Sequence, residues 1–256
     1  MLTVPAQADR LAELRSKVDA VTERNVDHGV LAFGIDAVDD RLAAGGLAVG
    51  GMHEVAGAST SLADDAAATL FIAGVAARFV AASTGQALWA TTRFDLYAPG
   101  LEQAGLRPAD VLYAELRDDN ALLALIEDAV RDGSPAVVIG EVRRASMVAT
   151  RRLQLAAAAR GVPVILFRRW RKLGREPFEE PSAASTRWRV GCAPSTPLRV
   201  AGVGRSRWAV DLVRQRGGEA CSWIVEGCDA TGRLAVPAPA RHRAAAQAGT
   251  SQHLAA

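Results

Sequence analysis

Residues 57–64 have the position of a phosphate-binding loop, between an apolar run and a long helix, but lack its chemistry. A working loop reads G-x-x-x-x-G-K-[ST], in which the lysine contacts phosphates and the hydroxyl binds Mg²⁺. Gly57 fills the first glycine position, whereas Leu62 stands at the second glycine, Ala63 at the lysine and Asp64 at the hydroxyl. The loop has lost its cation and its metal ligand, so we expect no cofactor.

Two consecutive carboxylates, Asp64 and Asp65, follow the loop. We expect them to cap the next helix and to occupy the positive end of its dipole. The same charges would repel a triphosphate. The sequence therefore predicts a nucleotide-binding scaffold that no longer binds nucleotide in the usual way.

Other reactive side chains form no recognisable catalytic or metal-binding set. The four histidines are scattered, and His53 lies beside a core strand, where we interpret it as structural. Cys192, Cys221 and Cys228 form no C-x-x-C pair, which favours reduced thiols over a zinc site. We predict neither an enzyme nor a metal protein.

The composition predicts one large core without a membrane segment. Half of the 256 residues are apolar, and the net charge of +2 gives no global attraction to nucleic acid. Arg78 interrupts the alanine-rich stretch 66–82, and the start of the chain lacks a signal-peptide pattern. We therefore expect a cytoplasmic protein that does not contact a membrane.

The loop belongs to a series of alternating strands and helices. Strands are expected at 52–56, 87–91, 111–114, 136–139 and 164–167, and helices at 66–80, 96–104, 120–130 and 144–160. This alternation predicts parallel βαβ units with helices on both faces of the sheet. From residue 186 the apolar period drops to two, and Gly217–Gly218 join two such segments in a predicted antiparallel hairpin.

The two ends of the chain differ from this core. Within residues 1–27 an apolar stripe predicts an amphipathic helix, formed by Leu11, Leu14, Val18 and Val21. The stripe packs either on its own domain, on a partner, or on a second copy of the chain. Packing on a second copy would make the protein a homo-oligomer. Residues 28–185 form the predicted core, 186–237 the antiparallel strands that complete it, and 238–256 a disordered tail.

Two groups of basic and aromatic residues are candidates for contacts with other molecules. The run 168–175 holds five cations and a tryptophan: Arg168, Arg169, Trp170, Arg171, Lys172 and Arg175. Such a run suits contact with DNA or with a protein partner. Alternatively, it is a solvated basic loop, or its arginines pair with Glu176, Glu179 and Glu180. In the C-terminal hairpin, Trp208 and Trp223 belong either to the core or, with Arg207, to a partner contact.

The order of these parts resembles a RecA-type core. Phe33-Gly34-Ile35, the stretch Gly45-Gly46-Leu47-Ala48-Val49-Gly50 and the run His53–Gly57 match the entry into that core's phosphate-binding loop. The tryptophan-containing strings 186–190, 205–212 and 217–226 resemble the C-terminal pattern of the ImuA family, RecA-like accessory proteins of damage-inducible mutagenesis. The resemblance covers residues 28–228 and implies an α/β fold: a central, mostly parallel sheet, helices on both faces and a small antiparallel C-terminal extension.

The resemblance also implies that catalytic residues are missing. Arg93 stands where the RecA pattern has a glutamate that prepares the attacking water. Gly140 follows Ile139 where the Walker-B aspartate is expected, and Glu141 replaces it only after a one-residue slip.

The ImuA resemblance implies a non-catalytic adaptor in an SOS-induced translesion DNA synthesis complex. Its implied partners are the Y-family polymerase homologue ImuB, through it an error-prone DnaE-type polymerase, and RecA. Two alternatives stay open, a RecA-like ATPase with a divergent site and a SulA-like inhibitor of the division protein FtsZ.

Overall fold

The computed structural model describes residues 28–170, 176–195, 201–202 and 204–237. The predicted N-terminal helix with its stripe, the residues Arg171, Lys172 and Arg175 of the basic run, and the predicted tail 238–256 lie outside the described residues.

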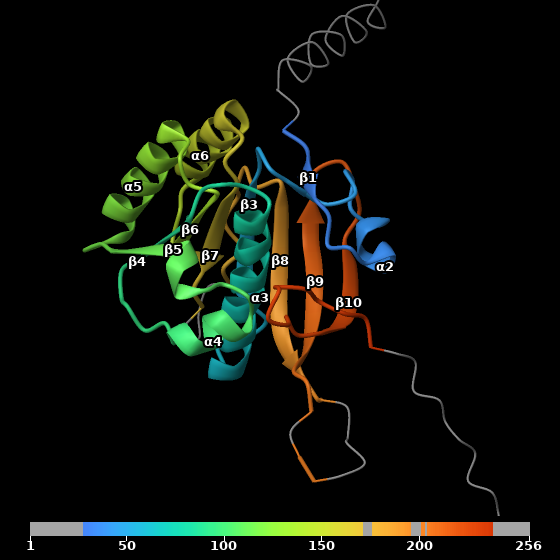
Figure 1. Ribbon diagram of the computed structural model, residues 1–256. Helices are drawn as coiled ribbons and strands as arrows, with labels where there is room; N and C mark the ends of the chain where they lie inside the picture. The colour runs from blue at the N-terminus through green and yellow to red at the C-terminus, as the bar shows by residue number, and fades with distance from the viewer. Residues whose placement is uncertain (1–27, 171–175, 196–200, 203, 238–256) are drawn as a thin grey trace, which may run out of the picture.

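An eight-stranded sheet forms the centre of the molecule, in the order β10-β9-β8-β3-β7-β6-β4-β5 (Figure 1). Its strands are β3 (Met52–Gly57), β4 (Ala87–Thr91), β5 (Val111–Glu115), β6 (Val137–Val142), β7 (Val164–Arg168), β8 (Thr186–Ala193), β9 (Arg207–Gln215) and β10 (Cys221–Glu226). The strands from β8 across to β5 pair in parallel, whereas β9 pairs antiparallel with both β8 and β10. The predicted α/β class and mostly parallel sheet are confirmed.

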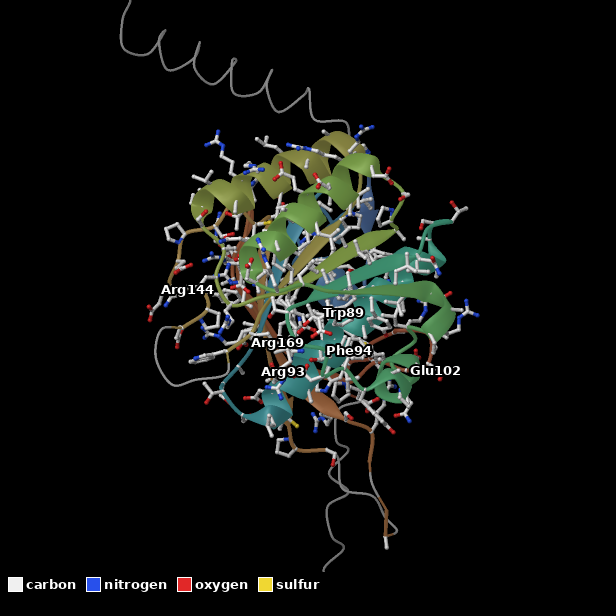
Figure 2. The ribbon with its side chains drawn as sticks, turned by 90° about the vertical axis from the view of Figure 1, so that its left-hand side faces the viewer. Trp89, Arg93, Phe94, Glu102, Arg144 and Arg169 are labelled. Carbon is white, nitrogen blue, oxygen red and sulfur yellow. The ribbon has the colours of Figure 1, made fainter. Side chains whose placement is uncertain are left out.

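Helices cover both faces of the sheet (Figures 1 and 2). One face carries α3 (Leu62–Ala81) and α4 (Ala98–Gln103), and the other carries α5 (Asp119–Asp132) and α6 (Met147–Arg160). Each face has its own apolar core, one centred on α3 and one beneath α5 and α6. On the α3 face Trp188 packs 6.0 Å from the ring of Phe71 and 5.7 Å from that of Phe33.

Short elements precede the core. β1 (Val30–Leu31) pairs antiparallel with β2 (Leu47–Ala48), and α2 (Asp36–Asp39) lies between them. Strands of two residues, such as β1 and β2, are too short to show a readable apolar period in the sequence. A 3₁₀ turn, η1 (Pro108–Asp110), leads into β5.

Three predicted boundaries move for local reasons. α3 starts at Leu62 rather than residue 66, because the side chain of Ser61 caps the helix. α6 starts at Met147 rather than residue 144, because Ser146 caps it in the same way. β6 does not end at residue 139 but continues through Gly140 and Glu141, paired with β7.

Candidate functional site

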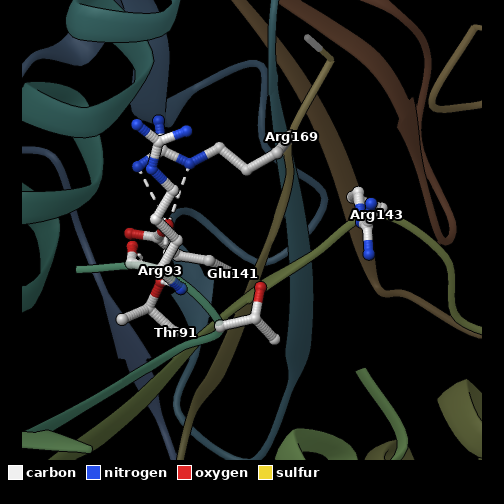
Figure 3. Close-up of a pocket in the computed structure, with 6 residues that line it drawn as sticks. Thr91, Arg93, Glu141, Arg143 and Arg169 are labelled. Carbon is white, nitrogen blue, oxygen red and sulfur yellow. Dashed lines mark hydrogen bonds and ion pairs between the residues drawn. The ribbon is translucent and has the colours of Figure 1, made fainter. Parts of the chain in front are cut away.

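A pocket of about 280 Å³ opens at the carboxyl ends of β4, β6 and β7 (Figure 3). The lining residues are Thr91, Thr92, Arg93, Glu141, Arg143 and Arg169. In open parallel sheets, ligands bind at this edge, outside the carboxyl ends of the strands. The sheet thus brings Arg93 and Glu141 together, two positions that the sequence had singled out separately.

The degenerate loop beside this pocket uses its own backbone donors. The N–H of Ala58 donates to the carbonyl oxygen of Val190 at 2.8 Å, which extends the pairing of β3 with β8. The N–H of Ser61 donates to Ser59 Oγ and that of Asp64 to Ser61 Oγ, both at 3.1 Å. In a phosphate-binding loop such N–H groups face the phosphates. Here these three already have partners.

Asp64 does not cap α3, which corrects the prediction from the sequence. Its carboxylate accepts hydrogen bonds from Ser59 Oγ at 2.5 Å and from the N–H of Cys192 at 2.7 Å, and so ties the loop to β8. Ser61 takes the capping role because it sits one residue before the helix begins. Leu62, at the position of the second glycine, points into solvent with 86% of its surface exposed.

Arg169 occupies the space between the start of α3 and the end of β6. Its Nε and Nη2 lie 3.0 and 2.9 Å from Oε2 of Glu141, and its Nη1 pairs with the carboxylate of Asp65. Its Nη2 also lies 3.6 Å from Oδ1 of Asp95. The guanidinium stacks 4.2 Å from the ring of Phe167. Figure 3 shows Arg169 reaching across to Glu141, with Arg143 set apart.

Both oxygens of Glu141 are engaged. Oε1 accepts from the indole N–H of Trp89 at 2.7 Å, and Oε2 accepts from Arg169 and from Thr91 Oγ1 at 3.2 Å. The side chain is buried, and this burial raises its pKa, while the positive charge of Arg169 opposes the rise. Hydrogen bonds from Trp89, Thr91 and Arg169 therefore hold this carboxylate in place.

Arg168 forms a second network on the opposite face of the sheet. Its Nη1 lies 3.2 Å from Oε1 of Glu54, whose other oxygen accepts from Arg187 Nε at 2.7 Å. Its Nη2 lies 3.4 Å from Oε2 of Glu180. Arg187 also donates to the carbonyl oxygens of Phe178 and Glu180, which holds the 176–185 segment over β8.

Of the interpretations left open for 168–175, pairing with nearby glutamates holds for Arg168, which pairs with Glu180, whereas Arg169 pairs with Glu141 and Asp65. Arg168 and Arg169 are 2% and 9% exposed, and each is neutralised by carboxylates. Trp170 is half-buried.

The C-terminal tryptophans are mainly core residues. Trp208 is 3% exposed and packs on Phe71 at 6.5 Å, so of the two interpretations left open it is the core one that holds for Trp208. Trp223 is half-buried, stacks on Trp188 at 6.2 Å and donates its indole N–H to the carbonyl oxygen of Ala37. Arg207 beside them is half-buried.

Sequence reasoning missed Asp65 and Asp95 as partners of Arg169. Asp65 lies 104 positions from Arg169, and no local pattern links the two. The sequence held one signal for such partners, the two arginines that directly follow the predicted strand 164–167. If the end of that strand is buried, each of these cations needs a carboxylate partner. The part of the chain that the structure describes has no group of three His, Cys, Asp or Glu side chains placed to hold a metal ion.

Comparison with known proteins finds relatives in sequence and neighbours in structure. The chain is 36% identical over 206 residues to the protein ImuA of Caulobacter vibrioides, in both strain NA1000 / CB15N and strain ATCC 19089 / CIP 103742 / CB 15. Each match covers 78% of this chain and 84% of the relative. No protein-family model matches the sequence.

Among the solved structures that match is the RadB recombinase. Its crystal structure matches with a TM-score of 0.55 and 16% identity, over 81% of this chain and 100% of RadB. This likeness confirms the RecA-like fold. No helix within the described ranges has the length and apolar character needed to cross a membrane.

Proposed function

Because this chain belongs to the ImuA family, we propose that it is a non-catalytic adaptor of an SOS-induced, error-prone translesion DNA synthesis complex. In this proposal it binds an ImuB-type homologue of the Y-family polymerases in the cytoplasm. A DnaE-type polymerase joins through that partner, and RecA is a further partner.

The observation that carries the non-catalytic role is the placement of Arg169. In a working P-loop enzyme the start of the helix and the end of the Walker-B strand hold Mg²⁺ between them. In this chain Asp65 and Glu141 at those two places pair with a guanidinium of the protein itself. A tethered cation satisfies the carboxylates that a metal would need.

The rest of the loop supports the same proposal. Ala63 supplies no charge for a phosphate, and Asp64 is committed to Ser59 and Cys192. Charge-assisted hydrogen bonds are the strong contacts to phosphate, and this loop provides none from a lysine. A scaffold without these contacts retains its surfaces for protein partners.

Calorimetry with Mg-ATP tests the non-catalytic role. We expect no saturable binding below millimolar nucleotide, and no hydrolysis above background. Micromolar binding that is lost in Glu141→Gln would instead support the alternative, a RecA-like ATPase with a divergent site.

Co-purification tests the adaptor role. The tagged chain from cells with damaged DNA should retain the ImuB-type homologue. Retention of FtsZ without that homologue would overturn the proposal in favour of a SulA-like division inhibitor.

A further inference from the structure

A groove lies between the outer face of α6 and the end of β9, far along the chain from the degenerate loop. It encloses about 320 Å³, and its walls include Met147, Arg151, Leu155, Ala158, Arg214 and Arg216. Ser182 and Ala183 also line it. No residue of this groove takes part in either arginine network described above.

The α6 wall is apolar where a solvent-facing helix is normally polar. Met147, Val148 and Leu155 are 46%, 69% and 61% exposed, whereas the opposite side of the helix buries Leu153 and Ala157 in the core. Residues spaced by three, four and seven or eight positions share one face of a helix. The exposed apolar residues therefore form a stripe along α6.

The cations of the groove have no carboxylate partner among the described residues. Arg214 donates to the carbonyl oxygen of Ser182 at 3.0 Å, and Arg216 to that of Ala183 at 3.2 Å. These bonds fix the two guanidiniums but leave their charge uncompensated. By contrast Arg152, next to Arg151 on the helix, pairs with Glu127.

We propose that this groove docks an acidic amphipathic helix of a partner protein. Apolar side chains of that helix would lie on Met147, Leu155 and Ala158, and its carboxylates would meet Arg151, Arg214 and Arg216. This is helix-in-groove recognition, with apolar anchors on successive turns. α6 has 14 residues and is therefore about 20 Å long, enough to support three or four turns of a partner helix.

The chemistry of the lining favours a protein over nucleic acid. Single-stranded nucleic acid is held by stacking on aromatic rings within a basic channel. The groove has cations but no aromatic residue in its lining. Its aliphatic wall suits leucine-like anchors, and a helix carries these together with carboxylates.

The inference rests on the proposed function, because the probe is the purified ImuB-type homologue. Its affinity for the full chain is measured by calorimetry with wild type, Leu155→Ser and Arg151→Glu. We expect each change to weaken binding at least tenfold. Leu112→Ser and Arg117→Glu are matched controls on another surface, since Leu112 is 55% exposed and the Arg117 side chain 86% exposed. Neither control should change the affinity.

The outcomes separate the two proposals. If wild type does not bind the homologue, the proposed function fails and this docking surface fails with it. If wild type binds and both groove variants bind equally well, only the docking surface is overturned. Light scattering tests whether a second copy of the chain occupies the groove, and oligonucleotide binding tests whether nucleic acid does. A wild-type dimer that becomes a monomer in Leu155→Ser would assign the groove to a second copy. An effect of Arg151→Glu on DNA alone would assign it to nucleic acid.

Discussion

Arg169 neutralises two carboxylates inside the molecule, so its removal should be costly. In Arg169→Met, Glu141 and Asp65 keep their positions but lose their cation. Breaking a buried ion pair in this way costs about 3–5 kcal/mol of unfolding free energy. Urea denaturation measures the loss. Arg107→Met, which breaks the exposed pair with Asp110, is the control and should change stability little. Unchanged stability of Arg169→Met would contradict the network.

The same variant should respond to pH in a defined direction. Burial already raises the pKa of Glu141, and loss of Arg169 removes the main opposing charge. A carboxyl group whose pKa is raised in the folded state contributes stability below its unfolded pKa, and this contribution is lost as pH rises. The stability gap between Arg169→Met and wild type should therefore narrow as pH falls from 7 towards 4.5. A gap that widens would show that Glu141 does not carry the effect.

His53 should make the protein sensitive to acid. Its Nδ1 lies 2.8 Å from Thr186 Oγ1 and its Nε2 3.0 Å from the carbonyl oxygen of Ala48. A carbonyl only accepts, so Nε2 carries the proton of a neutral ring. Burial lowers the pKa of His53 from 6.5 to about 4. This shift contributes roughly 3 kcal/mol above pH 6.5, which is lost as pH falls towards 4.

His53→Gln provides the measurement for this prediction. Glutamine keeps a donor and an acceptor but does not titrate in this range. The unfolding free energy of wild type should fall relative to that of the variant between pH 6.5 and 4, because only wild type gains a proton on unfolding there. Parallel pH profiles would contradict the assignment. The burial of His53 confirms its interpretation as a structural residue.

At the scale of elements, strand alternation decides what the basic run does. Consecutive residues of a strand point to opposite faces of the sheet. β7 continues one residue beyond the predicted end, to Arg168, so Arg168 and Arg169 enter different networks on different faces. The sequence showed two adjacent cations but could not show that the strand extends into them. Carboxylates from distant elements, Glu54 and Glu141, make that extension possible.

The contact of α3 with the segment after β10 depends on a glycine. A Cβ on Gly74 would lie 2.1 Å from Cys228 Sγ and 3.2 Å from the Gly232 carbonyl oxygen. A helix glycine replaced by alanine normally gains up to about 1 kcal/mol. Gly74→Ala should instead lose roughly 1–3 kcal/mol, because the segment must move away.

Two further variants test the cause of that loss in thermal unfolding. Gly100→Ala in α4 is the control, since its Cβ would meet mainly the exposed ring of Tyr97 at 3.2 Å. It should be neutral or stabilising. Adding Cys228→Ala to Gly74→Ala should restore part of the stability by removing the sulfur. No rescue, or a gain in Gly74→Ala alone, would contradict this packing.

For the whole molecule, periodicity in the sequence predicted the strands of the sheet. It did not predict the ion pairs that Arg168 and Arg169 form at the end of β7. Short apolar runs alternating with helices identified the parallel strands, because burial on both faces leaves a continuous apolar signature. The period-two segments likewise identified β9 and β10. The sequence did not decide whether Trp208 is a core or a surface residue, because alternation along a strand does not show which face of the sheet another element covers. At the site, the sequence predicted only that the phosphate-binding lysine and the metal-binding hydroxyl are missing, at Ala63 and Asp64. It could not predict that the Arg169 guanidinium lies beside them, because folding brings that residue there from a distant part of the chain.

The C-terminal strands should be required for the core to fold. β8 pairs in parallel with β3, from His53 opposite Thr186 to Gly57 opposite Val190, so β3 is an interior strand. A chain ending at residue 185 would expose the β3 edge and remove Trp188 and Trp208 from the α3 core. We expect such a chain to show neither a near-ultraviolet circular dichroism signal nor a cooperative urea transition.

A chain ending at residue 237 is the control, because it keeps every described strand. It should unfold cooperatively at the same urea concentration as the full chain. A cooperative transition in the chain ending at 185 would mean that residues 28–185 fold alone, and that the strands from β8 onward are an attachment. We expect the opposite, since the loop after β3 is tied to β8 through Ala58 and Val190 and through Asp64 and Cys192. The degenerate loop and the C-terminal strands then form one cooperative unit.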